Sequence, residues 1–140
     1  MCRVHLVEVR KIYEAIRELG GEVLVVSFTP PKKVAIYLAK YPLPFPIASD
    51  PTLAAYRAFA LEKTTVGSML RPGVLLRFLG TLLHGWRLDM PTRGDDLMQL
   101  GGDFVLDADG RLRYAHPSSE PTDRPSAEAL LQAMRDAQKG

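Results

Sequence analysis

Residues 20–31 read GGEVLVVSFTPP, and this stretch decides the fold. The glycine pair ends a helix, because glycine readily adopts the left-handed conformation that closes a helical turn. The continuous apolar run over Glu22–Phe28 is typical of a strand buried on both faces of a parallel sheet. Thr29 stands where a helix N-cap would, before prolines that a first helical turn accepts. The order helix, strand, helix predicts an α/β fold.

Elements of the same kinds flank this stretch on both sides. Apolar residues recur at helical spacing over residues 4–19, between charged positions, and predict an amphipathic helix. Downstream, the pattern predicts a helix to about Tyr41, a short strand at Phe45–Ala48 and a helix at Thr52–Phe59. We therefore expect two parallel strands joined by a covering helix.

The C-terminal part of the chain carries a hairpin signal. Two β-rich runs, Asp103–Leu106 and Arg111–Ala115, flank the turn sequence DADG at 107–110. Ser126 is a suitable N-cap for a last helix over Ala127–Gln138. Parallel strands first, then a hairpin and a closing helix, indicate a thioredoxin-like three-layer α/β fold with a mixed central sheet. Since the chain opens directly into a helix, we expect this sheet to lack its usual first strand.

Length and charge limit the classes of function. A chain of 140 residues predicts a single domain, 1–140. Its formal net charge is only +2, with basic residues spread along the sequence, so we expect no nucleic-acid binding. The sequence has no run of about 18 apolar residues and no apolar leader behind Met1. We therefore expect no integral membrane segment and a cytoplasmic location.

A strongly apolar helical pattern over Pro72–Trp86 stands between the two halves of the chain. It predicts an apolar helical insertion around residues 70–90. Two interpretations stay open for it. The insertion is either a buried helix or a dimer contact, or it is an interfacial helix that touches lipid or an apolar substrate.

The sequence contains one cysteine, Cys2, and three histidines that lie far apart, at positions 5, 84 and 116. One cysteine excludes an internal disulfide framework and a multi-cysteine metal site. We expect neither a cofactor nor a metal. Asp107 and Asp109 could suggest a metal loop, but the later acidic ligand of an EF-hand is missing, and a hairpin turn accounts for them.

Five pieces of sequence together resemble the AhpC/TSA family, in its divergent peroxiredoxin-like branch. They occur in the order of the family and extend over nearly the whole chain. Each piece alone is weak, because an Asp-x-Asp-Gly hairpin occurs in many folds. The pieces are CRVHLVEVR (2–10), GGEVLVVSFTPP (20–31), PFPIASDP (44–51), YRAFAL (56–61) and GGDFVLDADGRLRYAH (101–116).

The resemblance implies a thioredoxin fold and a redox-active cysteine. In the family a first strand leads into a cysteine loop, and Cys2 matches the second cysteine of that loop. The chain thus looks truncated at its N-terminus, either by a misplaced start or as a short paralogue. Typical members also carry an arginine near the later hairpin strand that supports the thiolate, and Gly101-Gly102-Asp103 occupies that region here.

The surroundings of Cys2 favour a reactive thiol. A free cysteine has a pKa of about 8.5, and a helix N-terminus or a neighbouring cation lowers that pKa. Cys2 stands just before the first predicted helix, with Arg3 adjacent and His5 three residues on. The alternative is that Cys2 is a relic at a frayed terminus. His5 is either the base beside Cys2 or a partly exposed polar residue, and Thr29 either binds substrate or caps a helix.

Two hypotheses for function follow. The first is a thiol-dependent redox protein, a peroxiredoxin-like antioxidant or disulfide oxidoreductase in which Cys2 reacts. Its partners would be a peroxide or disulfide substrate and an external thiol reductant, because the chain has no second cysteine to resolve a disulfide. The second is a non-catalytic thioredoxin-fold protein that acts by partner binding or by forming a homodimer through an open sheet edge or the 72–86 segment.

Overall fold

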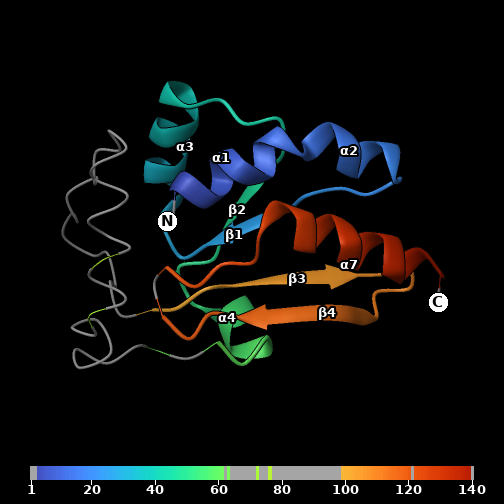
Figure 1. The fold of residues 1–140 in the computed structure, drawn as a ribbon. Helices are drawn as coiled ribbons and strands as arrows, with labels where there is room; N and C mark the ends of the chain where they lie inside the picture. The colour runs from blue at the N-terminus through green and yellow to red at the C-terminus, as the bar shows by residue number, and fades with distance from the viewer. Residues whose placement is uncertain are drawn as a thin grey trace.

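The computed structural model describes residues 3–61, 63, 72, 76, 99–120 and 122–139. Cys2 and most of the expected insertion around residues 70–90 lie outside the described residues. Figure 1 shows how the described elements are arranged. In chain order they are α1 (Arg3–Lys11), α2 (Tyr13–Glu18), β1 (Val25–Ser27), α3 (Pro31–Lys40), β2 (Ile47–Ser49), α4 (Ala54–Ala58), β3 (Gly102–Leu106), β4 (Leu112–Pro117) and α7 (Ala127–Lys139).

The helix expected over residues 4–19 is present as two helices, α1 and α2, which meet at Ile12. The glycine stop is confirmed. Gly20 has a positive φ of 72°, and its N–H donates to the carbonyl of Arg17 at 2.9 Å. The N–H of Gly21 donates to the carbonyl of Ile16 at 2.9 Å. These two bonds form a Schellman motif, which satisfies carbonyls that the end of a helix would otherwise leave open.

The strand predicted within Glu22–Phe28 is the three-residue β1, and it pairs in parallel with β2. The expectation of burial on both faces is wrong. Ser27 is the one buried residue of β1, and the neighbouring Leu24 is 62% exposed. Within the described residues, β1 pairs with β2 alone, so fewer neighbouring elements cover it than would cover a strand inside a larger parallel sheet.

The helix after β1 begins without the cap that the sequence suggested. The N-cap of α3 is Pro30, and no side chain caps this helix, so the prediction of Thr29 as N-cap is wrong. The Thr29 hydroxyl instead accepts a hydrogen bond from Ser27 Oγ at 2.9 Å. Its carbonyl accepts one from Ser49 Oγ at 2.7 Å. Thr29 thus connects the ends of β1 and β2 through hydrogen bonds.

The C-terminal hairpin and the helix after it are confirmed. Strands β3 and β4 pair antiparallel, with Asp103 opposite His116. Gly110 in the connecting turn has a φ of 78°, a conformation that glycine adopts without strain. Ser126 caps α7, because its Oγ accepts the N–H of Ala129 at 3.1 Å.

The strands form two separate two-stranded ladders among the described residues, one parallel and one antiparallel. The mixed strand directions expected for the fold are therefore present. Helix α7 contacts both β3 and β4, and it also contacts α2 (Figure 1). A buried apolar cluster joins α1, the loop before β2 and α7, and it consists of Leu6, Val9, Phe45 and Leu130.

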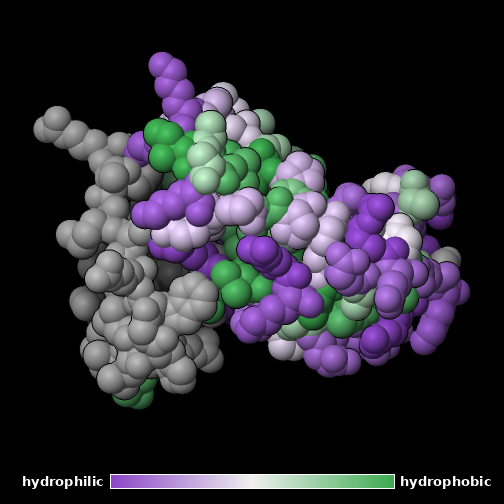
Figure 2. Space-filling model, turned by 90° about the horizontal axis from the view of Figure 1, so that it is seen from above, coloured by the Kyte–Doolittle hydropathy of each residue, from purple (hydrophilic) through white to green (hydrophobic). Residues whose placement is uncertain are grey.

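Some apolar side chains remain at the surface. Figure 2, which looks down on the molecule of Figure 1, shows them among hydrophilic neighbours. Ile36 on α3 is the most exposed of the large ones, at 70%. Within the described part of the chain, no helix is long and apolar enough to cross a membrane.

The buried cluster predicts a large effect for the substitution Phe45→Ala. Phe45 is 3% exposed and its ring meets Tyr13 edge-on, with centroids 5.5 Å apart. Removing this ring should lower the free energy of unfolding by about 3–5 kcal/mol, measured by urea unfolding. The exposed control Ile36→Ala should change it by less than about 0.5 kcal/mol. Equal effects of the two substitutions would contradict the placement of the core.

Candidate functional site

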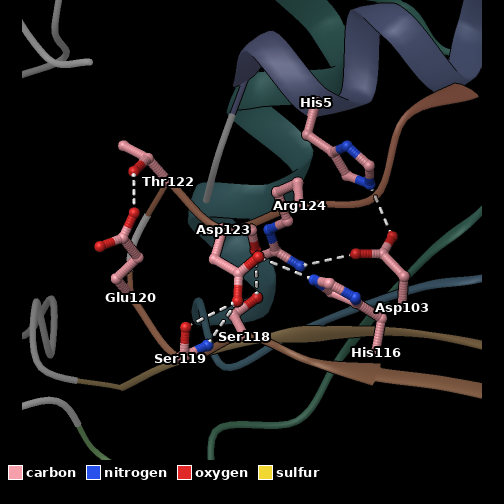
Figure 3. Close-up of polar contacts among 9 residues, drawn as sticks. All are labelled: His5, Asp103, His116, Ser118, Ser119, Glu120, Thr122, Asp123 and Arg124. Carbon is pink, nitrogen blue, oxygen red and sulfur yellow. Dashed lines mark hydrogen bonds and ion pairs between the residues drawn. The ribbon is translucent and has the colours of Figure 1, made fainter. Parts of the chain in front are cut away.

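The carboxylate of Asp103 lies between a histidine and an arginine that come from different parts of the chain (Figure 3). Oδ1 of Asp103 is 2.6 Å from His5 Nε2, and Oδ2 is 3.1 Å from Arg124 Nη1. The three side chains are largely buried, with exposed fractions of 12% for His5, 15% for Asp103 and 22% for Arg124. We call these three residues the Asp103 cluster.

Three elements bring the Asp103 cluster together. His5 lies on α1, and the same helix is fixed by the burial of Leu6 in the apolar cluster. Asp103 lies on β3, and Arg124 lies in the loop that leads into α7. Gly101 makes room for the guanidinium, because a Cβ at this position would lie 2.5 Å from Arg124 Nη2. A larger residue at position 101 would therefore displace Arg124.

Opposing effects set the pKa of Asp103. Burial raises the pKa of this carboxyl, since it disfavours the charged form. The hydrogen bond and charge of His5, and then those of Arg124, outweigh burial and hold the pKa below its usual value. Asp103 is therefore ionised at neutral pH and accepts the Nε2–H of His5.

A second histidine–aspartate pair holds the loop that carries Arg124. His116 Nε2 is 2.9 Å from Asp123 Oδ1. Asp123 Oδ2 accepts the backbone N–H of Ser119 at 2.8 Å and its hydroxyl at 2.9 Å. The Ser119 N–H lowers the pKa of Asp123 most, burial raises it, and His116 lowers it further. The residue next to Arg124 is thus anchored to β4, which limits where the guanidinium can lie.

One buried donor in the cluster has no partner. Within the described residues, Arg124 Nε is buried and forms no hydrogen bond. Burial raises the pKa of Tyr56 of α4 by more than the charge of Arg124 lowers it, so the net shift is upward. Its hydroxyl donates to the carbonyl of Val26 on β1 at 3.2 Å.

Among the described residues, the candidate site residues predicted from the sequence contact different parts of the structure. Cys2 lies outside the described residues, and it is bonded to Arg3, the first residue of α1. The Arg3 guanidinium lies over the Tyr41 ring, 4.1 Å from its centroid. His5 belongs to the Asp103 cluster, whereas Thr29 contacts Ser27 and Ser49 at the ends of the parallel ladder.

Most of the site was not visible in the sequence. His5 and Asp103 are 98 positions apart, and Asp103 and Arg124 are 21 apart. No motif of fixed spacing joins them, and Asp103 reads as an ordinary residue of a hairpin strand. Among the described residues, no group of three or more His, Cys, Asp or Glu side chains could hold a metal ion.

The fold and the site define the class of protein. A helix-covered parallel ladder, followed by an antiparallel hairpin and a closing helix, is a thioredoxin-like α/β arrangement. The sequence matches the family model described as AhpC/TSA antioxidant enzyme over residues 8–120, which is well over half of the chain. The protein therefore belongs to the AhpC/TSA family, whose members have a thiol-dependent redox, peroxiredoxin-like kind of function.

The matched span includes only some of the residues of the site. It begins after Cys2 and His5, includes Asp103 and His116, and ends before Arg124. A search of curated proteins gave no match. The roles of individual residues therefore have to be argued from this chain.

The double pairing of Asp103 predicts a pH-dependent contribution to stability. At pH 7, Asp103→Asn should lower the free energy of unfolding by about 2 kcal/mol, because it leaves two buried donors poorly paired. The folded-state pKa lies below the unfolded value of about 3.9, so the contribution is present above that value. The contribution is lost as the pH falls through the folded-state pKa. Urea unfolding at several pH values from 7 to 2 should therefore show that the difference in free energy of unfolding between the wild type and Asp103→Asn becomes smaller.

The control for this substitution is Asp136→Asn on α7. Asp136 is exposed and pairs with Lys139 at 3.5 Å, so its loss should cost less than about 0.5 kcal/mol at any pH. A cost for Asp103→Asn that stays constant down to pH 2 would show that its carboxylate is not the stabilising group.

Proposed function

We propose that the protein is a thiol-dependent redox protein in which Cys2 reacts with a peroxide or a disulfide. The observation that carries the proposal is the start of α1 at Arg3, in a chain of the AhpC/TSA family. Cys2 directly precedes this helix in the chain, and the first N–H groups and the positive end of a helix favour a thiolate. The charge of Arg3 is adjacent to it in the chain.

The chemistry with a peroxide transfers two electrons. The Cys2 thiolate attacks one peroxide oxygen, an S–O bond forms and the O–O bond breaks. The second oxygen leaves with a proton as water or an alcohol, and Cys2 becomes a sulfenic acid. An external thiol condenses with the sulfenic acid, which releases water and leaves a mixed disulfide. A second external thiol then exchanges with this disulfide and restores the Cys2 thiol.

The reductant in this scheme comes from outside the chain. Cys2 is the single cysteine of the 140 residues, so none of them supplies a second thiol that could resolve a disulfide with it. A reducing compartment such as the cytoplasm supplies external thiols in abundance, and it fits this requirement.

Peroxide oxidation of the folded protein tests the proposal. Treatment with a slight excess of hydrogen peroxide, followed by a sulfenic-acid-specific label and mass spectrometry, should show rapid modification of Cys2. The matched control is the same protein unfolded in urea, which keeps the thiol and loses its surroundings. The folded protein should react at least about tenfold faster, and Cys2→Ser should give no label. A folded protein that reacts no faster than the unfolded one contradicts the proposal.

A second candidate is a non-catalytic protein that forms a homodimer. The observation in its favour is the separation of the parallel and antiparallel ladders, because a two-stranded ladder has edges that another chain can extend. Light scattering after gel filtration should then give twice the 15.5 kDa mass of one chain. A protein that is monomeric and is rapidly oxidised at Cys2 would contradict this alternative and would support the redox function.

A further inference from the structure

We propose that the face of the β3–β4 hairpin turned away from α7 packs against the same face of a second copy of this chain. None of its residues takes part in the reaction proposed for Cys2, so this interaction is separate from the proposed function. We call the surface the outer hairpin face. It consists of Phe104, Leu106, Leu112, Ala115 and Pro117.

The strand register shows which residues of β3 lie on this face. Asp103 is opposite His116 in the ladder, and it reaches His5 on α1 from the inner face (Figure 3). Successive residues of a strand point to opposite faces of a sheet. Phe104 therefore points away from α1, and so does Leu106 two positions further on.

Strand β4 follows the same pattern. Ala115 and Pro117 are exposed, whereas Tyr114 packs against the buried apolar cluster from the inner face. The register shifts next to Leu106 and puts Leu112 opposite it. Residues opposite each other in a ladder share a face. The outer hairpin face thus carries apolar side chains from both strands.

The described elements cover only one end of the outer hairpin face. In Figure 1, α7 lies on the other side of the hairpin, and α4 lies near the end of β4 that is away from the connecting turn. Phe59 at the end of α4 meets Phe104, with ring centroids 4.5 Å apart. At the turn end, Leu106 and Leu112 remain 48% and 52% exposed. Apolar side chains that adjoin each other at the surface mark a contact site, whereas isolated ones do not.

The charges around the turn favour a second copy as the partner. Asp107 and Arg113 pair with each other at 2.8 Å. Asp109 and Arg111 are both exposed, and neither side chain forms an ion pair within the described part of the chain. The four charges sum to zero, so this rim does not attract a nucleic acid, an acidic peptide or an anionic membrane. It leaves one acid and one base to pair across a contact.

Two-fold symmetry makes the outer hairpin face complementary to itself. In a symmetric dimer each contact is formed twice, with the two residues exchanged between the copies. An axis along the hairpin would place Leu106 over Leu112 of the partner subunit. The same axis would bring Asp109 close to Arg111 of the partner subunit. Two ladders stacked about 10 Å apart in this way form a small β-sandwich.

The size of the face predicts a weak dimer. A two-stranded ladder of five residues is only about 17 Å long and about 10 Å wide. Stable protein interfaces bury about 800 Å² of each partner, which is more than this face supplies. We therefore expect an equilibrium between monomer and dimer that depends on protein concentration.

Sedimentation equilibrium from about 10 µM to about 1 mM protein tests the proposal. The average mass should rise from the 15.5 kDa of one chain toward twice that value. A reducing agent in every sample prevents an intermolecular disulfide of Cys2. Leu112→Thr keeps a residue suited to a strand but removes apolar surface twice in each dimer, so it should raise the dissociation constant at least about tenfold. The matched control is Leu24→Thr, because Leu24 is 62% exposed and precedes the other ladder, and it should change nothing.

Exchanging the two rim charges identifies the partner as a second copy. Asp109→Arg alone and Arg111→Asp alone should each weaken the dimer, because each puts like charges opposite one another. The variant with both substitutions should restore it, since both partners of a symmetric dimer change together. Both residues bind Asp107 through their backbone N–H groups, which the substitutions keep. Circular dichroism confirms that each variant is folded.

The outcomes do not depend on the reactivity of Cys2. A wild-type protein that stays monomeric at about 1 mM overturns the proposal. A dimer that Leu112→Thr leaves intact uses another surface, such as a ladder edge, and also overturns it. Equal weakening by Leu24→Thr, or a double charge variant that stays as weak as the single ones, would contradict the symmetric contact. Hairpin amides that only neutral lipid vesicles protect from hydrogen exchange would assign the face to a lipid surface instead.

Discussion

The apolar contact among Leu6, Val9, Phe45 and Leu130 is the constraint on which the rest of the structure depends. The parallel and antiparallel ladders are separate among the described residues, so backbone hydrogen bonds between strands do not join the two halves. The burial of these side chains holds α1 and α7 to the ladders instead, and burial of this kind is the main favourable contribution to folding. The N-terminal and C-terminal segments are therefore held by side-chain packing, and any site between them exists only in the folded chain.

Asp103 shows what this packing makes possible. An isolated carboxylate is costly to bury, and a buried ion pair is tolerated when its geometry and its remaining hydrogen bonds are good. His5 and Arg124 supply one partner for each oxygen of Asp103. Because α1, β3 and the loop before α7 each contribute one residue, the cluster connects the two halves of the chain by polar contacts in addition to the apolar ones. The same connection places a charged group beside the start of α1, where the redox thiol of this AhpC/TSA protein is proposed to act.

The elements that the sequence predicted correctly depend on residues close together in the chain. The stop at Gly20, the turn at residues 107–110 and the cap at Ser126 each involve hydrogen bonds over a few positions. Two predictions failed for a tertiary reason. Thr29 had the right residue type and position for a cap, but Ser27 and Ser49 engage it once β1 and β2 pair. The apolar run around β1 suggested full burial, but the extent of burial depends on how many strands and helices cover it.

The sequence by itself determined the α/β class, the parallel-then-antiparallel order of strands, the family and the position of Cys2 before a helix. These follow from periodicity, turn chemistry and local resemblance, which are properties of neighbouring residues. The tertiary structure decided the partners of His5. Its contact with Asp103 spans 98 positions, and the contact of Asp103 with Arg124 spans 21. No local pattern encodes such contacts, because they form only when packing brings α1, β3 and the loop before α7 to one place.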